Sequence, residues 1–121
     1  MKILGQILLA IVAVLHVYFL YLEMFLWTKP KGIKTFGLKS KEFAEETKVL
    51  AANQGLYNGF LAAGLFYGLF TDHLKFQIFF LICVTIAGIY GTYSTGKRKL
   101  FLIQSVPAVI CVTAILLNHY F

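Results

Sequence analysis

Two ionisable residues, His16 and Glu23, interrupt the first long apolar stretch of the sequence and are its first candidates for chemistry. Seven residues return a helix to within about 20° of the same face, so both share a face with Leu20 and Trp27. They would lie about 10 Å apart along the axis, too far for a direct hydrogen bond. Ionisable groups inside a membrane are costly and commonly functional. We therefore predict two separate polar sites on one helix face.

Each of these residues also has a structural explanation, which the sequence leaves open. Glu23 would reach the membrane interface and form an ion pair with Lys29 or Lys48. His16 would form a hydrogen bond between two helices.

A second polar group opens the next apolar stretch, where Asn53, Gln54, Tyr57 and Asn58 occupy an arc of about 140° on a helix. This arc is broad enough to line a cavity and to face the first helix. Other polar residues fall in the same half of their stretches, whereas the opposite halves are almost wholly apolar. We predict a polar cavity that faces the cytoplasm, with His16 at its floor. The candidate ligand-binding residues are His16, Glu23, Trp27, Asn53, Gln54, Tyr57, Asn58, Tyr90 and Gln104.

The other side of the second stretch carries small residues at intervals of four, Gly55, Gly59 and Ala63. This spacing is typical of close packing between membrane helices. We predict that it is the contact face of a homo-oligomer, with packing inside one bundle as the alternative.

Four apolar stretches, at about 3–27, 50–70, 74–93 and 100–121, must position these groups. Each is near the ~20 residues that a helix needs to cross the hydrocarbon core. Four strands could not close a barrel, and an open sheet edge in lipid would leave backbone groups unpaired. Short connections make neighbouring helices antiparallel. We predict an all-α fold, an integral membrane four-helix up-down-up-down bundle that forms a single domain, residues 1–121.

Two local signals refine this architecture. Ser40 is a typical N-cap, so the second helix should begin near residue 40 and extend into the cytoplasm before it enters the membrane. Pro107 cannot donate a hydrogen bond to the carbonyl of Ile103, which predicts a kink beside Gln104 and Ser105.

The distribution of Lys and Arg predicts the orientation. Nine fall in or beside the connections 28–43 and 94–99, against Lys2 and Lys75 on the other side. Cytoplasmic loops are rich in these residues. The protein should therefore lie in the cytoplasmic membrane, crossing it several times, with both termini outward and both basic connections in the cytoplasm.

Composition excludes several other classes of protein. Hydrophobic residues make up 60% of the chain and charged residues 13%, about half the charged fraction of a soluble domain. The net charge of +6 lies in short connections rather than along one surface, so no nucleic-acid partner is expected. Cys83 and Cys111 are too few for a disulfide framework. We expect no metal site and no cofactor, and the expected partners are membrane lipids and a small hydrophobic or amphipathic ligand.

Four segments of the chain resemble one family of small bacterial membrane proteins, domain-of-unknown-function family 1304. They are 16–27 (HVYFLYLEMFLW), 48–64 (KVLAANQGLYNGFLAAG), 87–91 (AGIYG) and 104–108 (QSVPA). The resemblance covers nearly the whole chain and implies a four-span membrane protein. It implies no activity.

Three functions fit these observations. The first is a carrier or exporter of a small, partly hydrophobic molecule, coupled to protons through Glu23 and His16. Small multidrug exporters, which act as dimers, also carry an acidic residue in the first of four short helices, an analogy at the level of the fold. The second is a membrane enzyme that uses Glu23 or His16 as general acid or base on a lipid-like or quinone-like substrate. The third is a non-catalytic assembly or partner subunit.

Overall fold

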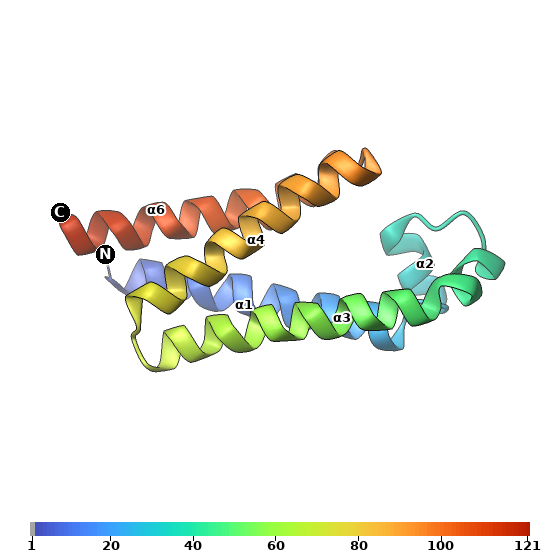
Figure 1. The fold of residues 1–121 in the computed structure, drawn as a ribbon, viewed down its shortest axis with the longest axis horizontal. Helices are drawn as coiled ribbons and strands as arrows, with labels where there is room; N and C mark the ends of the chain where they lie inside the picture. Colours follow the sequence, from blue (N-terminus) through green and yellow to red (C-terminus); the bar gives the residue numbers. More distant parts are fainter. Residues whose placement is uncertain (1) are drawn as a thin grey trace. The chain divides into compact units, whose positions relative to one another are not determined.

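A computed structural model describes residues 2–121, and every regular element in that range is helical. The elements, shown in Figure 1, are α1 (Lys2–Phe25), α2 (Pro30–Phe36), α3 (Lys41–Phe70), α4 (Leu74–Thr95), α5 (Arg98–Leu100), the π-helix η1 (Phe101–Ser105) and α6 (Val106–Tyr120). The predicted all-α fold is confirmed. The chain divides into two compact units. The first contains residues 2–13 and Ala63–Phe121, and the second contains Val14–Ala62.

Within residues 2–121, three helical segments are long and apolar enough to cross a membrane: Lys2–Phe25, Leu74–Thr95 and Arg98–Tyr120. Helix α3 has 30 residues, about 45 Å of helix, but its polar residues lower its mean hydropathy. The ion pair between Lys2 and Asp72, 2.7 Å long, nevertheless returns the chain after α3 to the start of α1. If α1 crosses the membrane, α3 must therefore cross it in the opposite direction.

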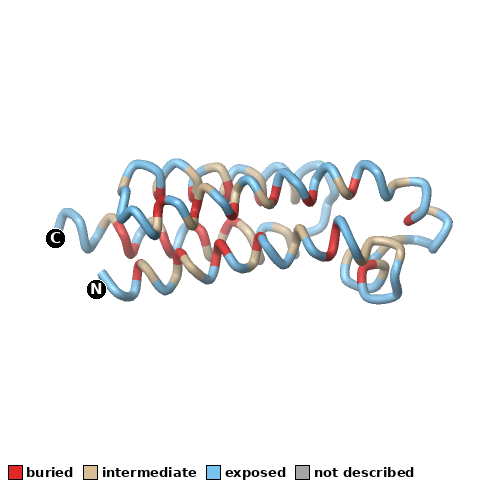
Figure 2. Tube along the Cα trace, turned by 90° about the horizontal axis from the view of Figure 1, so that it is seen from below, coloured by how far each residue is buried: buried red, intermediate tan, exposed pale blue. Residues whose placement is uncertain are grey.

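In the first unit, the start of α1 and the end of α3 pack with α4, η1 and α6. Buried residues recur at intervals along these helices (Figure 2), and the core includes Leu9, Leu65, Leu81, Val84 and Cys111. Small residues allow close approach between the helices. A Cβ on Gly64 would meet the ring of Phe80, and a Cβ on Gly5 would lie 3.1 Å from a side-chain carbon of Ile115.

The segment before Pro107 is a π-helix, where the sequence predicted only a kink. Because proline has no N–H, the hydrogen bond from residue 107 to Ile103 cannot form. The N–H of Val106 instead donates to the carbonyl of Phe101, five residues earlier. The wider turn directs Ser105 onto α4, where its Oγ donates to the carbonyl of Thr85 at 2.8 Å.

The second unit contains the end of α1, the short helix α2 and the first part of α3. The sequence predicted a connection at 28–43, and the structure places α2 within it. Pro30 lies in the first turn, where a missing N–H costs nothing, and Gly37 ends the helix at φ 62°, a left-handed conformation that favours glycine. The predicted N-cap is confirmed, because the Oγ of Ser40 accepts a hydrogen bond of 3.0 Å from the N–H of Phe43.

The orientation predicted from the Lys and Arg residues can be tested with three exposed positions, Lys34, His73 and Lys97. In a background without Cys83 and Cys111, single cysteines at 34 and 97 should resist a membrane-impermeant thiol reagent in intact cells. A cysteine at 73 should react, because the predicted orientation places it on the outer side. The opposite pattern would reverse the orientation, and reaction at 97 alone would show that α3 does not cross.

Candidate functional site

One face of α1 meets α3 throughout the second unit. His16, Leu20, Glu23 and Trp27 follow one another at intervals of four, three and four residues, which places them on one side of a helix. Three of them contact α3 directly: Leu20 lies over Gly59, and Glu23 and Trp27 form hydrogen bonds to it. The shared face predicted from the spacing is confirmed.

The centre of this face is a pair of buried polar side chains. The Nδ2 of Asn58 donates a hydrogen bond of 2.5 Å to the Oε1 of Glu23, and the two residues are 8% and 4% exposed. A carboxylate has about four acceptor positions, and the amide fills one of them. Burial of such a group in an apolar bundle is costly unless it is paired or functional.

The ion pair considered as an alternative for Glu23 is not present. Among residues 2–121 the ion pairs are Lys2 with Asp72 and Lys48 with Glu45, the second 3.2 Å long and exposed. Glu23 therefore has an amide partner and no cationic partner, and it lies inside the bundle rather than at its surface.

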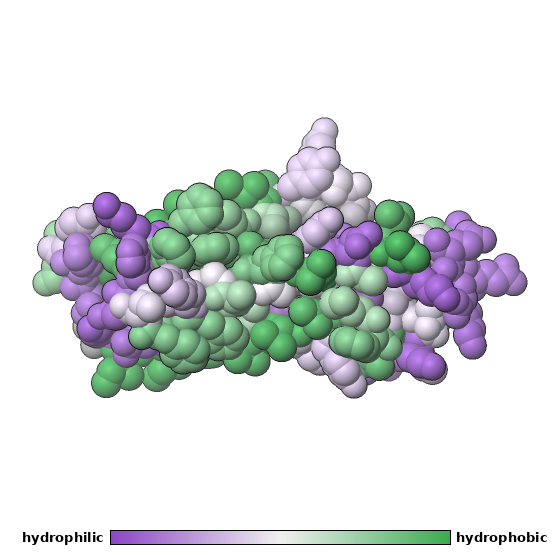
Figure 3. Space-filling view, turned by 60° about the horizontal axis from the view of Figure 1, so that its bottom comes forward, coloured by the Kyte–Doolittle hydropathy of each residue, from purple (hydrophilic) through white to green (hydrophobic). Residues whose placement is uncertain are grey.

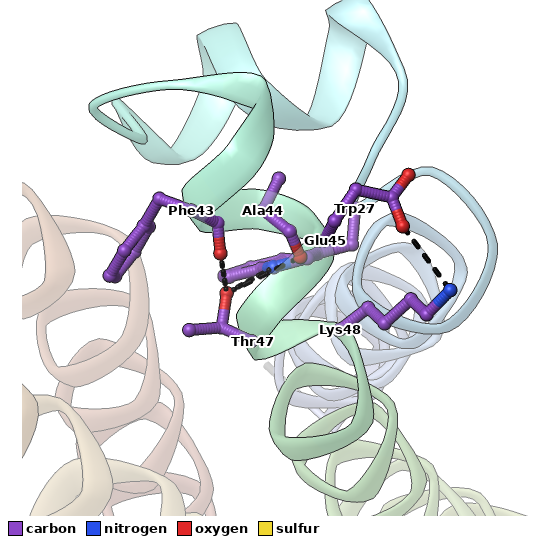
Figure 4. A network of polar contacts seen from close by, with 6 residues as sticks. All are labelled: Trp27, Phe43, Ala44, Glu45, Thr47 and Lys48. Carbon is purple, nitrogen blue, oxygen red and sulfur yellow. Dashed lines mark hydrogen bonds and ion pairs between the residues drawn. The ribbon is translucent and has the colours of Figure 1, made fainter.

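Trp27 and Thr47 anchor the polar end of this face (Figure 4). The indole Nε1 of Trp27 donates to the Oγ1 of Thr47 at 2.9 Å, and Thr47 donates to the carbonyl of Phe43 at 2.7 Å. The ring of Trp27 also packs on Phe36 of α2, with centroids 4.9 Å apart. Gly32 is buried against the carbonyl of Leu26, which leaves no room for a Cβ. The sequence did not single out Thr47, since a threonine at a helix start carries no distinguishing signal.

The predicted geometry of the α3 polar arc is wrong in one respect. Asn58 faces α1, but Asn53, Gln54 and Tyr57 are exposed, Tyr57 by 58%. The face that meets α1 is instead the one with the small residues. A Cβ on Gly55 would lie 3.1 Å from the Cβ of Glu23 and 3.2 Å from the carbonyl oxygen of Leu20.

The residues of the predicted oligomer face also have neighbours within this chain. Gly55 is buried and Gly59 half-buried against α1 of the same chain, while Ala63 is exposed. For the two glycines the structure shows the alternative, packing within one chain. Oligomerisation itself stays a prediction.

The remaining candidates are Tyr90, Gln104 and His16. Tyr90 is 66% exposed and Gln104 half-buried, and both belong to the first unit, so their part in a common cavity stays a prediction. His16 is fully buried, with its ring edge-on to Phe19 at 5.3 Å between centroids. In the described part of the chain, no three His, Cys, Asp or Glu side chains are grouped to hold a metal ion.

Comparison with known proteins places the chain in a family. Residues 10–116 match the family described as "Protein of unknown function (DUF1304)". The chain is 30% identical over 115 residues to "Uncharacterized protein YpaA" of Lactococcus lactis subsp. lactis (strain IL1403), a match that covers 93% of this chain and 96% of YpaA. No solved structure matches the chain. The family match spans most of the chain, including the Glu23–Asn58 pair, and the chain belongs to the DUF1304 family.

Proposed function

We propose that this small multi-span membrane protein binds a small amphipathic cation at the Glu23–Asn58 pair and carries it across the membrane in exchange for protons. The observation that supports this proposal is the buried carboxyl of Glu23, which has one amide partner and no ion pair among residues 2–121. A carboxylate in such a place can accept either a proton or a cationic group. The proton and the cationic group cannot occupy the carboxylate together. This competition would couple the movement of the cation to the opposite movement of protons.

Asn58 has a positioning part in this proposal. Its Nδ2 donates to one oxygen of Glu23 and so fixes the carboxyl plane, leaving the other oxygen for a ligand. Asn58 is held in turn by α3, whose Gly55 lets the backbone approach the side chain of Glu23.

Transport also requires more than one copy, because a single bundle of 121 residues is too thin to enclose a pathway. The α3 face with Asn53, Gln54 and Tyr57 is the one we expect a second copy to cover. These polar side chains are exposed on a helix that we expect to cross the membrane, and polar residues commonly join such helices.

The test is equilibrium binding of tetraphenylphosphonium to the protein in nanodiscs between pH 5 and pH 9. The probe has a fixed charge, so any dependence on pH belongs to the protein. Affinity should rise with pH, because the ligand binds the carboxylate and competes with a proton. Glu23→Gln should weaken binding at least tenfold, a loss of about 1.4 kcal/mol, and remove the pH dependence.

Glu46→Gln is the matched control, since Glu46 is an exposed acid in the same unit, on helix α3, and forms no ion pair among the described residues. It should bind as the wild type does. Equal loss in both variants, or no binding by the wild type, would contradict the proposed site. A protein that stays monomeric in nanodiscs would contradict the transport step and leave binding in place.

A further inference from the structure

A second polar site lies in the first unit, where the ends of three spans meet. Its volume is about 290 Å³, and it is lined by side chains from the start of α1, the α3–α4 turn, the start of α4 and the end of α6. Figure 3 shows hydrophilic side chains gathered at this end of the unit, on the left, beside the hydrophobic surface of the spans. The polar lining residues are Lys2, Gln6, Asp72, Gln77, Asn118 and His119.

Two of these residues form the acceptor side of the pocket. Gln77 is only 5% exposed, and its Nε2 donates to the carbonyl of Gly68 at 2.8 Å. This bond uses one of the two N–H groups of the amide, and the amide oxygen can accept a hydrogen bond from a ligand. Asp72 lies beside it in a tight turn at φ 51°, fixed by a hydrogen bond of 2.9 Å from the N–H of His73 to the same carbonyl. Carboxylate and amide oxygens suit an ammonium group that can donate hydrogen bonds.

The donor side comes from α1 and α6. Lys2 and Gln6 are one helical turn apart, and Asn118 and His119 end α6. A lysine, two amides and an imidazole can together donate to the oxygens of a phosphate. The pocket therefore presents both signs of charge. A simple anion would be repelled by Asp72, and a simple cation would be repelled by Lys2.

A ligand can displace the Lys2–Asp72 ion pair from this pocket. The two charged groups are 2.7 Å apart with side chains 59% and 55% exposed, and exposed ion pairs of this kind contribute little to stability. A zwitterion could replace this pair with two ion pairs of its own at little cost.

The position of the pocket indicates which zwitterion it would bind. The polar lining residues lie at or beside the ends of segments that cross the membrane, the level of lipid headgroups, and the apolar lining residues Leu74 and Ile115 suit the adjoining glycerol and acyl chain. We propose that this pocket binds a phosphoethanolamine group, with the ammonium on Asp72 and Gln77 and the phosphate on Lys2 and His119.

The test counts bound lipids by native mass spectrometry, with phosphatidylethanolamine, phosphatidylcholine and phosphatidylglycerol as probes. Phosphatidylethanolamine should bind most tightly, because the quaternary ammonium of phosphatidylcholine has no N–H to donate and phosphatidylglycerol has no cation. Asp72→Asn should weaken this binding about tenfold, and asparagine tolerates the left-handed turn. Lys2→Gln should do the same, whereas Lys75→Gln, which removes an exposed cation outside the pocket, should not.

Competition with soluble glycerophosphoethanolamine distinguishes recognition of the free headgroup from recognition of the intact lipid. If it displaces the lipid at millimolar concentration, the headgroup alone is recognised; if it does not, the site requires the intact lipid. Equal binding of phosphatidylglycerol, or binding unchanged by both Asp72→Asn and Lys2→Gln in folded protein, would overturn the proposal.

Discussion

Gly88→Ala is expected to lower the free energy of unfolding by about 1–2 kcal/mol, although alanine favours a helix by about 0.5–1 kcal/mol over glycine. The reason is the contact between α4 and η1. A Cβ on Gly88 would meet the Oγ of Ser105 and lie 2.8 Å from the backbone nitrogen of Ser105. The backbone cannot yield as a side chain can, so the two segments must separate. That separation would also lengthen the hydrogen bond from Ser105 to the carbonyl of Thr85.

Gly91→Ala is the matched control, one turn along the same helix. Its Cβ would lie 3.3 Å from the Cδ1 of Leu100, the end of a flexible side chain. Here the helix preference should dominate, and stability should be unchanged or raised by up to about 1 kcal/mol. Thermal unfolding in detergent compares the two variants. Adding Ser105→Ala to Gly88→Ala should restore only part of the loss, because the backbone nitrogen remains; equal melting of both glycine variants would refute the packing argument.

Spacing within one helix was a dependable guide to this fold. The order of His16, Leu20, Glu23 and Trp27 defines a helix face whatever the surroundings, and three of these residues do contact α3. The N-cap at Ser40 is equally local, since a serine oxygen needs only the N–H groups of its own first turn.

The side of α3 that packs against α1 could not be predicted from spacing in the same way. Helix α3 carries both a polar side and a side of small residues, and either can pack against another membrane helix. Periodicity places Gly55 and Asn53 on different sides without showing which side meets α1. The close approach at Gly55 decides it, with the carbonyl oxygen of Leu20 only 3.2 Å from a Cβ there, and this depends on both backbones.

Two short elements, α2 and the π-helix η1, could not be predicted from the sequence. Helix α2 has seven residues, too few to show a hydrophobic periodicity. It is held by the packing of Trp27 on its Phe36 and by the close contact of its Gly32 with the carbonyl of Leu26. Pro107 predicted a lost hydrogen bond, but the π-helix also depends on Ser105 reaching the carbonyl of Thr85, 20 residues earlier. Such contacts lie outside any local pattern.

Glu23→Leu and Asn58→Leu are each expected to destabilise the protein by about 1–2 kcal/mol, because each leaves the other polar group buried without its partner. The double variant Glu23→Leu/Asn58→Leu should regain most of that loss, since two apolar side chains replace both partners together. Thermal unfolding of the four proteins measures the coupling. A double variant that loses the sum of the two single effects would show that the pair does not interact.

The same double variant separates the structural part of the pair from the proposed function. Leucine in both places keeps the contact between α1 and α3 but offers neither a charge nor a proton acceptor. We therefore expect a protein that melts close to the wild type and binds tetraphenylphosphonium at least tenfold more weakly at pH 8. Unchanged binding would place the ligand elsewhere, and Glu23 and Asn58 would then serve only to join the two helices. Stability and binding respond differently here because packing needs the volume of the two side chains, whereas ligand binding needs their polar atoms.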